Sequence, residues 1–282
     1  MSETFEPKPE GIGEMYDKIA ALSKDMLGDS HHFGYFRGGA HDGVTMRDAA
    51  DAMTDLVIER LAVTPGQRVL DLGCGTGAPA VRLAESAHVE VVGITISNEQ
   101  LEIAQARAEA AGLADRVRFE LVDAMKMEFD AESFDAVLAI ESLEHMPDQR
   151  HVLRSITGIL RPGGRFVCAQ PMLHRVNDEE HLAFLRELYE MYNLPEQPFV
   201  DEYPRMFADA GLQLNRLEDV YREVMPPTLK LMTSWIGANT ERLAELGDYG
   251  TEVAGLVDGM EKFADLPGAG FVVLTADKAG AR

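Results

Sequence analysis

The stretch Glu141–Asp148 carries two glutamates and a histidine directly after an apolar segment that we expect to be a strand. In α/β proteins, ligands bind outside the carboxyl ends of the strands, so these side chains can reach a substrate. His145 is the best candidate base, because an imidazole with an ordinary pKa of about 6.5 transfers protons near neutrality. Glu144 and Glu141 could orient or charge this imidazole. The alternative is that His145 only caps the helix that follows Pro147.

A second group with chemical potential is a glycine-rich turn, Gly73–Gly77, which follows the apolar segment Arg68–Leu72. A strand, a glycine turn and a helix over Ala78–Ser86 would open a doubly wound α/β domain. The spacing is G-x-G-x-G, whereas the G-x-G-x-x-G motif places a pyrophosphate on a helix N-terminus. Thr95 also ends the next strand, where dinucleotide enzymes usually carry a carboxylate for the ribose. Both features count against an NAD-dependent oxidoreductase, and the rest of the chain must decide the ligand.

Composition limits the class of protein and the kind of partner. The chain has 282 residues, of which 46% are hydrophobic and 26% charged, as in a globular protein with one large domain. Its net charge of −22 disfavours nucleic acid and anionic membranes, and favours a small acceptor that is neutral or cationic. No apolar run approaches the ~20 residues that a membrane span needs. The sequence does not set the oligomeric state, and it is compatible with a homo-oligomer.

The cysteines and the N-terminus predict a location. Cys74 and Cys168 are too few for a disulfide framework, so we expect two reduced thiols. Residues 1–11 are polar and acidic and contain no apolar signal region. Both features are typical of a cytoplasmic protein.

Short apolar segments alternate with helical segments from residue 68 onward. The expected strands are Arg68–Gly73, Glu90–Ile96, Val117–Val122, Phe134–Ile140 and Gly164–Gln170, and the expected helices are Ala78–Ser86, Asn98–Ala111 and Asp148–Leu160. This alternation predicts a mostly parallel sheet that is covered by helices on both faces.

The flanking segments are expected to be mainly helical. Helices are predicted over Ile12–Leu27, Met46–Leu61 with a cap at Thr45, His181–Tyr192, Val200–Ala210, and Thr228–Ala264 with breaks at Gly237, Gly247 and Gly250. Two further strands are predicted over Gln213–Met225 and Gly270–Ala276. Because the first helices precede the first strand, we expect them to cap its carboxyl end.

The motifs DLGCGTG, GITIS, VDAM, AIESLEHMPD, LRPGG and GFVVLTADK resemble, in this order, those of class I S-adenosylmethionine-dependent methyltransferases. The resemblance covers roughly residues 12–276. Within the class, the chain is similar to natural-product methyltransferases such as the rebeccamycin sugar O-methyltransferase, which share Met15-Tyr16-Asp17, His32-Phe33-Gly34-Tyr35 and Asp201-Glu202-Tyr203. The resemblance implies methyl transfer from S-adenosylmethionine to a small, largely apolar acceptor.

The same resemblance implies a domain organisation. We expect a Rossmann-like core with a mostly parallel, seven-stranded sheet whose last strand is antiparallel. Residues 1–64 would form a helical cap, and residues 65–282 would form the core, with lid insertions at about 173–200 and 226–266.

The resemblance also assigns residues to the cofactor. These are Asp71, Gly73, Gly75, Gly77, Thr95, Gln100, Asp123, Ala124 and Ile140, together with Tyr16, His32 and Tyr35 in a lid that closes over the cofactor and the acceptor. The glycines would face the methionine moiety, Gln100 and Thr95 the ribose, and Asp123 with Ala124 the adenine. Two simpler readings stay open, in which Asp123-Ala124 is an ordinary strand-end turn and Gln100 only completes a capping box with Ser97.

The atom that receives the methyl group stays open between oxygen and carbon. A hydroxyl acceptor needs a base within hydrogen-bond reach, for which His145 is the candidate. The rebeccamycin enzyme has two consecutive histidines at this motif and an aspartate after the fifth strand, whereas this chain has Glu144-His145 and Gln170. ESLEHMPD is also similar to the motif of tocopherol C-methyltransferases. In carbon methylation Glu144, His145 or His174 would remove a proton from the methylated cation.

The acceptor pocket is expected between the N-terminal cap and the segments Met172–Phe199 and Met225–Trp235. An adaptable apolar lining would come from Met191, Met206, Met225, Met232 and Trp235, unless these residues only pack in the core. His174 and His181 are weaker candidates for contact with the acceptor. No set of side chains has the spacing of metal ligands, so no metal is expected. The alternative functions are a protein that binds S-adenosylmethionine but catalyses a reaction other than methyl transfer and, less favoured, the NAD-dependent oxidoreductase.

Overall fold

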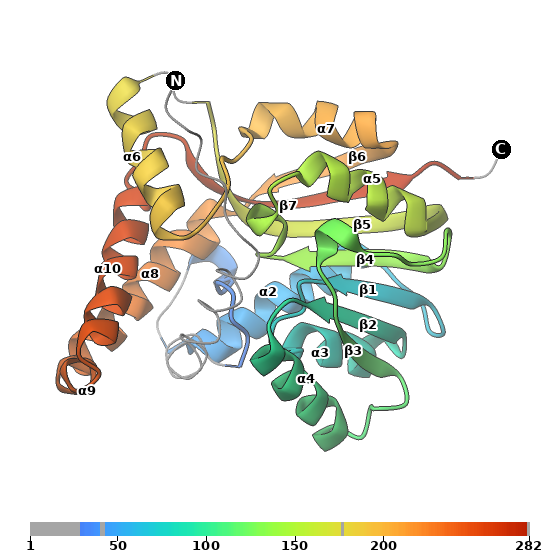
Figure 1. Ribbon diagram of the computed structural model, residues 1–282, viewed down its shortest axis with the longest axis horizontal. Helices are drawn as coiled ribbons and strands as arrows, with labels where there is room; N and C mark the ends of the chain where they lie inside the picture. The colour runs from blue at the N-terminus through green and yellow to red at the C-terminus, as the bar shows by residue number, and fades with distance from the viewer. Residues whose placement is uncertain (1–28, 40–42, 176–177, 281–282) are drawn as a thin grey trace.

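The chain forms one sheet of seven strands with helices on both faces in a computed structural model that describes residues 29–39, 43–175 and 178–280 (Figure 1). The strands are β1 (Arg68–Leu72), β2 (Glu90–Thr95), β3 (Val117–Leu121), β4 (Phe134–Ile140), β5 (Leu160–Leu173), β6 (Leu212–Asp219) and β7 (Ala269–Lys278). The α-helices are α2 (Met46–Leu61), α3 (Ala78–Ala87), α4 (Asn98–Ala110), α5 (Gln149–Ile159), α6 (Glu179–Met191), α7 (Tyr203–Ala210), α8 (Tyr221–Ala238), α9 (Thr240–Glu245) and α10 (Asp248–Ala264). Four 3-10 turns are η1 (Arg37–Gly39), η2 (Ala124–Lys126), η3 (Leu143–His145) and η4 (Val200–Glu202).

The strand order is β3-β2-β1-β4-β5-β7-β6, and β7 is antiparallel to both of its neighbours. The other pairs, β3–β2, β2–β1, β1–β4 and β4–β5, are parallel. The predicted mostly parallel sheet with an antiparallel last strand is therefore confirmed. The order reverses between β1 and β4, so the connections that leave these two strands run in opposite directions and a crevice opens between them.

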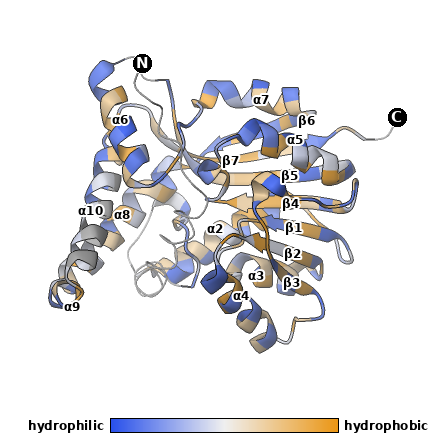
Figure 2. Cartoon of the chain, in the orientation of Figure 1, coloured by the Kyte–Doolittle hydropathy of each residue, from blue (hydrophilic) through white to orange (hydrophobic). Residues whose placement is uncertain are grey.

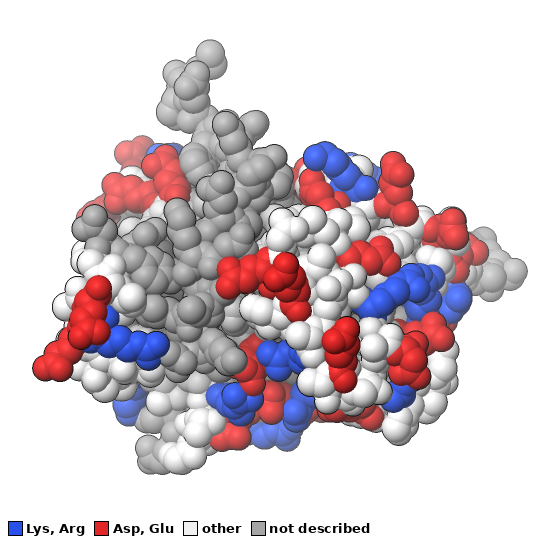
Figure 3. All heavy atoms as spheres, turned by 60° about the horizontal axis from the view of Figure 1, so that its bottom comes forward, with Lys and Arg blue, Asp and Glu red and all other residues white. Residues whose placement is uncertain are grey.

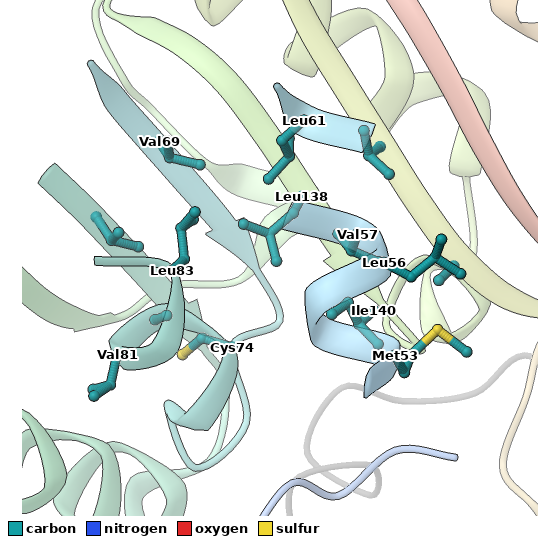
Figure 4. Close-up of a cluster of buried hydrophobic side chains, with 14 of the residues drawn as sticks. Met53, Leu56, Val57, Leu61, Val69, Cys74, Val81, Leu83, Leu138 and Ile140 are labelled. Atoms are coloured by element: carbon teal, nitrogen blue, oxygen red, sulfur yellow. The ribbon is translucent and has the colours of Figure 1, made fainter. Parts of the chain in front are cut away.

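The central strands are buried because helices cover both faces of the sheet. Figure 2 shows these strands mostly in orange, whereas the outer helices mix hydrophobic and hydrophilic residues. On one face, Met53, Val57 and Leu61 of α2 pack near Val69 of β1 and Leu138 of β4 (Figure 4). A second hydrophobic cluster on the other face joins the sheet to α5 and α7. Such double coverage explains why the strands read as continuous apolar runs rather than as an alternating pattern.

The helix α2 has the predicted bounds, and Thr45 begins it with a reciprocal capping box to Asp48. Beyond the carboxyl ends of the parallel strands, α6, α8 and α10 lie together on one side of the sheet (Figure 1). The helix predicted over Ile12–Leu27 lies outside the described residues. The division into a cap over 1–64 and a core over 65–282 stays a prediction.

Two predictions about the second half are wrong. The strand predicted over Gln213–Met225 ends at Asp219, and α8 begins at Tyr221, whose N–H donates to Asp219 Oδ1 at 2.9 Å. The predicted break at Gly250 is absent, because this residue lies inside α10. A Cβ at Gly250 would overlap the backbone of Leu243, so the glycine lets α9 approach α10 closely instead of ending a helix.

The strand β5 is longer than predicted and begins before the Pro162-Gly163 turn. Leu160 pairs with Phe134, and the register of the two strands then shifts before Ala136. The Pro162-Gly163 turn is therefore an irregularity within β5 and does not mark the start of the strand.

None of the described helices is both long enough and apolar enough to cross a lipid bilayer. In the view of Figure 3, acidic and basic side chains are interspersed over the described surface, and no extended basic area is visible on this face.

Gly77 is the residue that lets α3 pack closely against the sheet. It is the N-cap of α3 with a left-handed φ of 76°. A Cβ at this position would lie 2.6 Å from the Phe119 ring and 2.8 Å from Ala104 Cβ. Gly75, two residues earlier, is also left-handed, but its Cβ position has open space around it.

This difference predicts a difference in stability between Gly77→Ala and Gly75→Ala. Both variants carry the strain of a left-handed alanine, so their comparison isolates the packing clash. We expect Gly77→Ala to be less stable by about 1–3 kcal/mol, the usual cost of overpacking, and its Tm to be lower by roughly 2–10 °C. Calorimetry on the two variants measures this difference, and equal Tm values would contradict the packing role of Gly77.

Candidate functional site

A cavity of about 1060 Å³, including its open mouth, lies at the carboxyl ends of β1, β2 and β4 and beside the loop that follows β3. Eleven of the predicted residues are among those that line it: Asp71, Gly73, Gly75, Thr95, Gln100, Asp123, Ala124, Ile140, Glu141, His145 and His32. The crevice at the switch point of the sheet thus brings the glycine turn and the ESLEHMPD motif to one place.

The glycine turn leaves β1 and forms the floor of this cavity. Gly73 has a φ of 76°, and a Cβ there would overlap the side chain of Ser142 in the loop after β4. The Ser142 hydroxyl in turn donates a hydrogen bond at 2.5 Å to the carbonyl of Leu72. At Gly75 the space that a Cβ would take is empty. The turn therefore packs against the loop after β4 at Gly73 and exposes its backbone at Gly75. Gly77 is not among the described lining residues.

Asp71 precedes the turn and is the buried acid of the cavity. Its side chain is 2% exposed, and Oδ2 has no hydrogen-bond partner among the described residues. Burial raises the pKa of Asp71 to about 7. A buried carboxyl oxygen without a donor is rare in folded proteins, so this atom is suited to a positively charged or N–H-bearing ligand.

Gln100 presents an oriented amide to the cavity. Ser97 Oγ accepts the N–H of Gln100 at 3.1 Å, which is the first half of the predicted capping box. The side-chain carbonyl of Gln100 accepts the Thr95 hydroxyl at 2.9 Å. Because this bond fixes the carbonyl side of the amide, the NH₂ side remains as a donor for a ligand.

Asp123 both caps a turn and lines the cavity. Its Oδ1 accepts the N–H of Met125 at 2.9 Å, and its Oδ2 lies 3.2 Å from Lys126 Nζ. These contacts make Asp123 the N-cap of η2, as the strand-end alternative supposed. Since Asp123 and Ala124 are also lining residues, the turn presents them to the cavity at the same time.

His145 lies in η3, where its ring reaches the cavity. The N-cap of the following helix α5 is Asp148, whose Oδ1 accepts the N–H of His151 at 2.8 Å. The alternative that His145 caps this helix is therefore wrong. Burial lowers the pKa of His145 to about 4, so the imidazole is neutral at physiological pH.

Glu141 and Glu144 are both partly or fully buried, but only Glu141 is among the described residues that line the cavity. Glu141 lines the cavity with a left-handed φ of 46°, and its Oε1 accepts the N–H of Phe33 at 2.7 Å. Burial and the nearby Glu144 carboxyl raise the pKa of Glu141 well above its usual range. Glu144 is not among the described lining residues, its Oε2 has no hydrogen-bond partner among the described residues, and burial raises its pKa to about 8.

Gln170 is tied into the protein interior. Its Nε2 donates to the Tyr203 hydroxyl at 2.5 Å, and its Oε1 accepts from Cys168 Sγ at 3.1 Å. Gln170 is not among the described lining residues. The residue that stands where the rebeccamycin enzyme has an aspartate thus helps to hold Tyr203 of the D-E-Y segment.

The three predicted lid residues differ in where they lie. His32 lines the cavity, and burial lowers its pKa to about 4. Tyr35 packs against the hydrophobic cluster that α2 and α8 share, and it is not a described lining residue. Tyr16 lies outside the described residues. His31 also lines the cavity and was not predicted, although it adjoins the predicted H-F-G-Y loop.

The predicted acceptor-lining residues do not line this cavity. Met206, Met225 and Met232 are buried in the two hydrophobic clusters. Met191 is 51% exposed, and Trp235 packs against Leu243. The other candidates, His174 and His181, pair with Asp219 and Asp178 at 3.7 and 3.8 Å. In the described ranges, no group of three His, Cys, Asp or Glu side chains is arranged to hold a metal ion.

Comparison with known proteins agrees with this geometry. A family model described as a methyltransferase domain matches residues 63–211. Methyltransferase GfsG of Streptomyces halstedii is 35% identical over 267 residues, which cover 95% of this chain and 94% of that protein. The 27-O-demethylrifamycin SV methyltransferase of Amycolatopsis mediterranei is 35% identical, with coverage of 96% and 98%.

Solved structures share the fold over almost the whole chain. The crystal structure of the [4+2]-cyclase SpnF has a TM-score of 0.82 at 29% sequence identity and covers 98% of each chain. The mycolic acid cyclopropane synthase CmaA1, complexed with SAH, has a TM-score of 0.85 at 19% identity, with coverage of 97% and 99%, a likeness that shows the fold alone. From the family match and these relatives, the chain belongs to the methyltransferase domain family and is an S-adenosylmethionine-dependent methyltransferase.

Proposed function

We propose that the cavity binds S-adenosylmethionine and that the enzyme methylates a hydroxyl oxygen of a small, uncharged natural product. The observation that carries this proposal is the meeting, in one cavity, of the exposed glycine backbone, the unpartnered oxygen of Asp71 and the neutral imidazole of His145. The names of the curated relatives, among them the rifamycin methyltransferase and the O-methyltransferase resE of Aspergillus sclerotiorum, support oxygen as the acceptor atom.

The residues of the cavity fit the cofactor. Asp71 offers its free oxygen to the ammonium of the methionine moiety, and the open space at Gly75 admits that moiety against the backbone. Gln100 offers its amide NH₂ to the ribose oxygens. Asp123 and Ala124 would border the adenine. When bound, the cofactor supplies an electrophilic methyl group on a sulfonium.

The charges of the lining support an acceptor without negative charge. Three carboxyl groups line the cavity, from Asp71, Asp123 and Glu141, and no Lys or Arg is found among the described lining residues. A negatively charged acceptor would therefore lack a cationic side chain to pair with among these residues, in a partly enclosed space where an unpaired charge is costly. Apolar lining residues such as Ile94, Ile140 and Met146 suit a hydrocarbon body.

His145 is the group that can receive the acceptor's proton. Because its pKa is about 4, the imidazole is neutral at pH 7 and can act as a proton acceptor. A hydroxyl oxygen that gains a methyl group becomes a strong acid, so a weak base suffices. Glu141 uses one oxygen to hold Phe33, and Glu144 does not reach the cavity, so neither replaces His145 in this role.

Isotope labelling tests the reaction. The purified enzyme is incubated with cofactor that carries a deuterated methyl group and with extracts of a metabolite-producing host, and mass spectrometry and NMR locate the label. A label on oxygen supports the proposal. A label on carbon would contradict oxygen transfer, and tight cofactor binding without any labelled product would favour a reaction other than methyl transfer, as in the relative described as a cyclase.

Replacement of His145 tests its role as the base. We expect His145→Ala to lower kcat by about 10²-fold, a typical loss for general base catalysis, while the Kd for S-adenosylmethionine changes little. The control is His174→Ala, which removes an exposed histidine outside the cavity and should retain turnover. An unchanged kcat in His145→Ala would rule out the assignment.

Cofactor affinity should depend on pH through Asp71. The free protein holds a proton on Asp71 below pH 7, and a bound cation favours the ionised carboxylate, so binding releases this proton. The Kd for S-adenosylmethionine should therefore fall by about tenfold between pH 6 and pH 8 and change little above that range.

Calorimetry over this pH range, in buffers of different ionisation enthalpy, measures both the Kd and the proton release. In Asp71→Asn the binding should be weaker and its pH dependence lost. The exposed Asp130→Asn variant should keep the wild-type profile. A wild-type Kd that stays constant across the range would refute the linkage to Asp71.

A further inference from the structure

One wall of the cavity is a strap of eight residues, Asp29–Phe36, which contributes His31 and His32 to the lining. The strap contains no helix and no strand, so its backbone N–H groups must find partners elsewhere. The helices α2 and α8 and the loop after β4 supply them. Phe33 N–H donates to Glu141, and Tyr35 N–H donates at 2.8 Å to a carbonyl of α2.

Two further backbone N–H groups of the strap donate to α8. Gly34 N–H donates to the Thr228 hydroxyl at 3.3 Å, and Phe36 N–H donates to the carbonyl of Glu223 at 2.7 Å. Phe36 is 1% exposed, and Thr228 is fully buried. The Phe36 N–H would therefore be a buried donor without a partner if the Glu223 carbonyl were engaged elsewhere.

A carbonyl in the middle of a helix is normally engaged. It accepts the N–H four residues later, or the N–H three residues later in a tightened turn. For Glu223 these two positions are Pro227 and Pro226, which both lie inside α8. Since proline has no N–H, neither position can donate.

Glu223 is the residue of α8 for which both positions are prolines. The carbonyl of Arg222 can still turn to the N–H of Met225, and that of Val224 can still accept from Thr228. The pair of prolines thus frees the carbonyl that accepts Phe36, while its neighbours keep a donor within the helix.

We propose that Pro227 is a positioning residue of this methyltransferase, which keeps the Glu223 carbonyl free to bind the strap and so holds His31 and His32 as a wall of the cavity. This inference rests on the proposed function in that the cavity is taken as the cofactor site. Proline in a helix interior is costly, and at this position it leaves the Glu223 carbonyl to the strap.

The test compares Pro227→Ala with Pro226→Ala. The first variant restores the N–H that competes directly for the Glu223 carbonyl. The second makes the same chemical change one residue earlier, where the restored N–H pairs with the carbonyl of Arg222. Both changes remove a helix-breaking residue, so a purely structural role of the prolines predicts equal or higher Tm and unchanged ligand binding in both variants.

We expect the Kd and KM for S-adenosylmethionine to rise by about 3–10-fold in Pro227→Ala, the effect of weakening one hydrogen bond, with kcat changed less than about twofold. In Pro226→Ala both constants should stay within about twofold of the wild type. Equal affinities in the two variants would overturn the inference. A wild-type protein that binds neither S-adenosylmethionine nor S-adenosylhomocysteine would instead overturn the proposed function.

If Pro227→Ala does not fold, Thr228→Val provides the second test. It removes the hydroxyl that accepts Gly34 N–H and preserves the shape of the side chain. Thr233→Val on the same helix is the matched control, because the Thr233 hydroxyl donates to Leu229 and Glu261 and makes no recorded contact with the strap. A raised cofactor Kd in Thr228→Val alone supports the docking of the strap on α8, and an unchanged Kd contradicts it.

Discussion

Parallel strands end at one edge of the sheet, and the connections that leave β1 and β4 must diverge there because the strand order reverses between them. The crevice that results decides which residues of the chain meet. The glycine turn comes from β1, Gln100 follows β2, Asp123 follows β3, and Glu141 and His145 follow β4. Residues that are up to 72 positions apart thus share one cavity, because the neighbouring strands that precede them end at the same edge of the sheet.

The chemistry of the cavity follows largely from the burial of its titratable groups. Asp71 and Glu144 have raised pKa values and His145 has a lowered one, and desolvation is the largest cause in each case. Neutral forms are therefore favoured on all three groups. Asp71 can ionise when a cationic cofactor binds beside it, because a nearby opposite charge favours the carboxylate. The site is also suited to proton transfer by an imidazole that water does not protonate.

Main-chain hydrogen bonds hold one wall of the cavity in place. The strap Asp29–Phe36 binds to α2, to α8 and to the Glu141 carboxylate, so one segment joins the helices around the cavity to the end of β4. Gly34 permits this approach, because a Cβ there would overlap Ala49. The strap connects the cofactor side of the site to α8, which lies with α6 and α10 beyond the sheet (Figure 1).

The sequence alone determined the order of strands and helices up to β5, the start of α2 at Thr45 and the glycine turn, because these follow from local periodicity, capping and backbone freedom. Strand-end positions and the family resemblance together predicted eleven of the residues that line the cavity. Tertiary structure decided the rest. Gly75 and Gly77 look alike in the motif, but only their neighbours show that one borders open space and the other Phe119. The boundary between β6 and α8, the burial that sets the pKa of His145, and the partner of the Glu223 carbonyl likewise depend on residues distant in the chain.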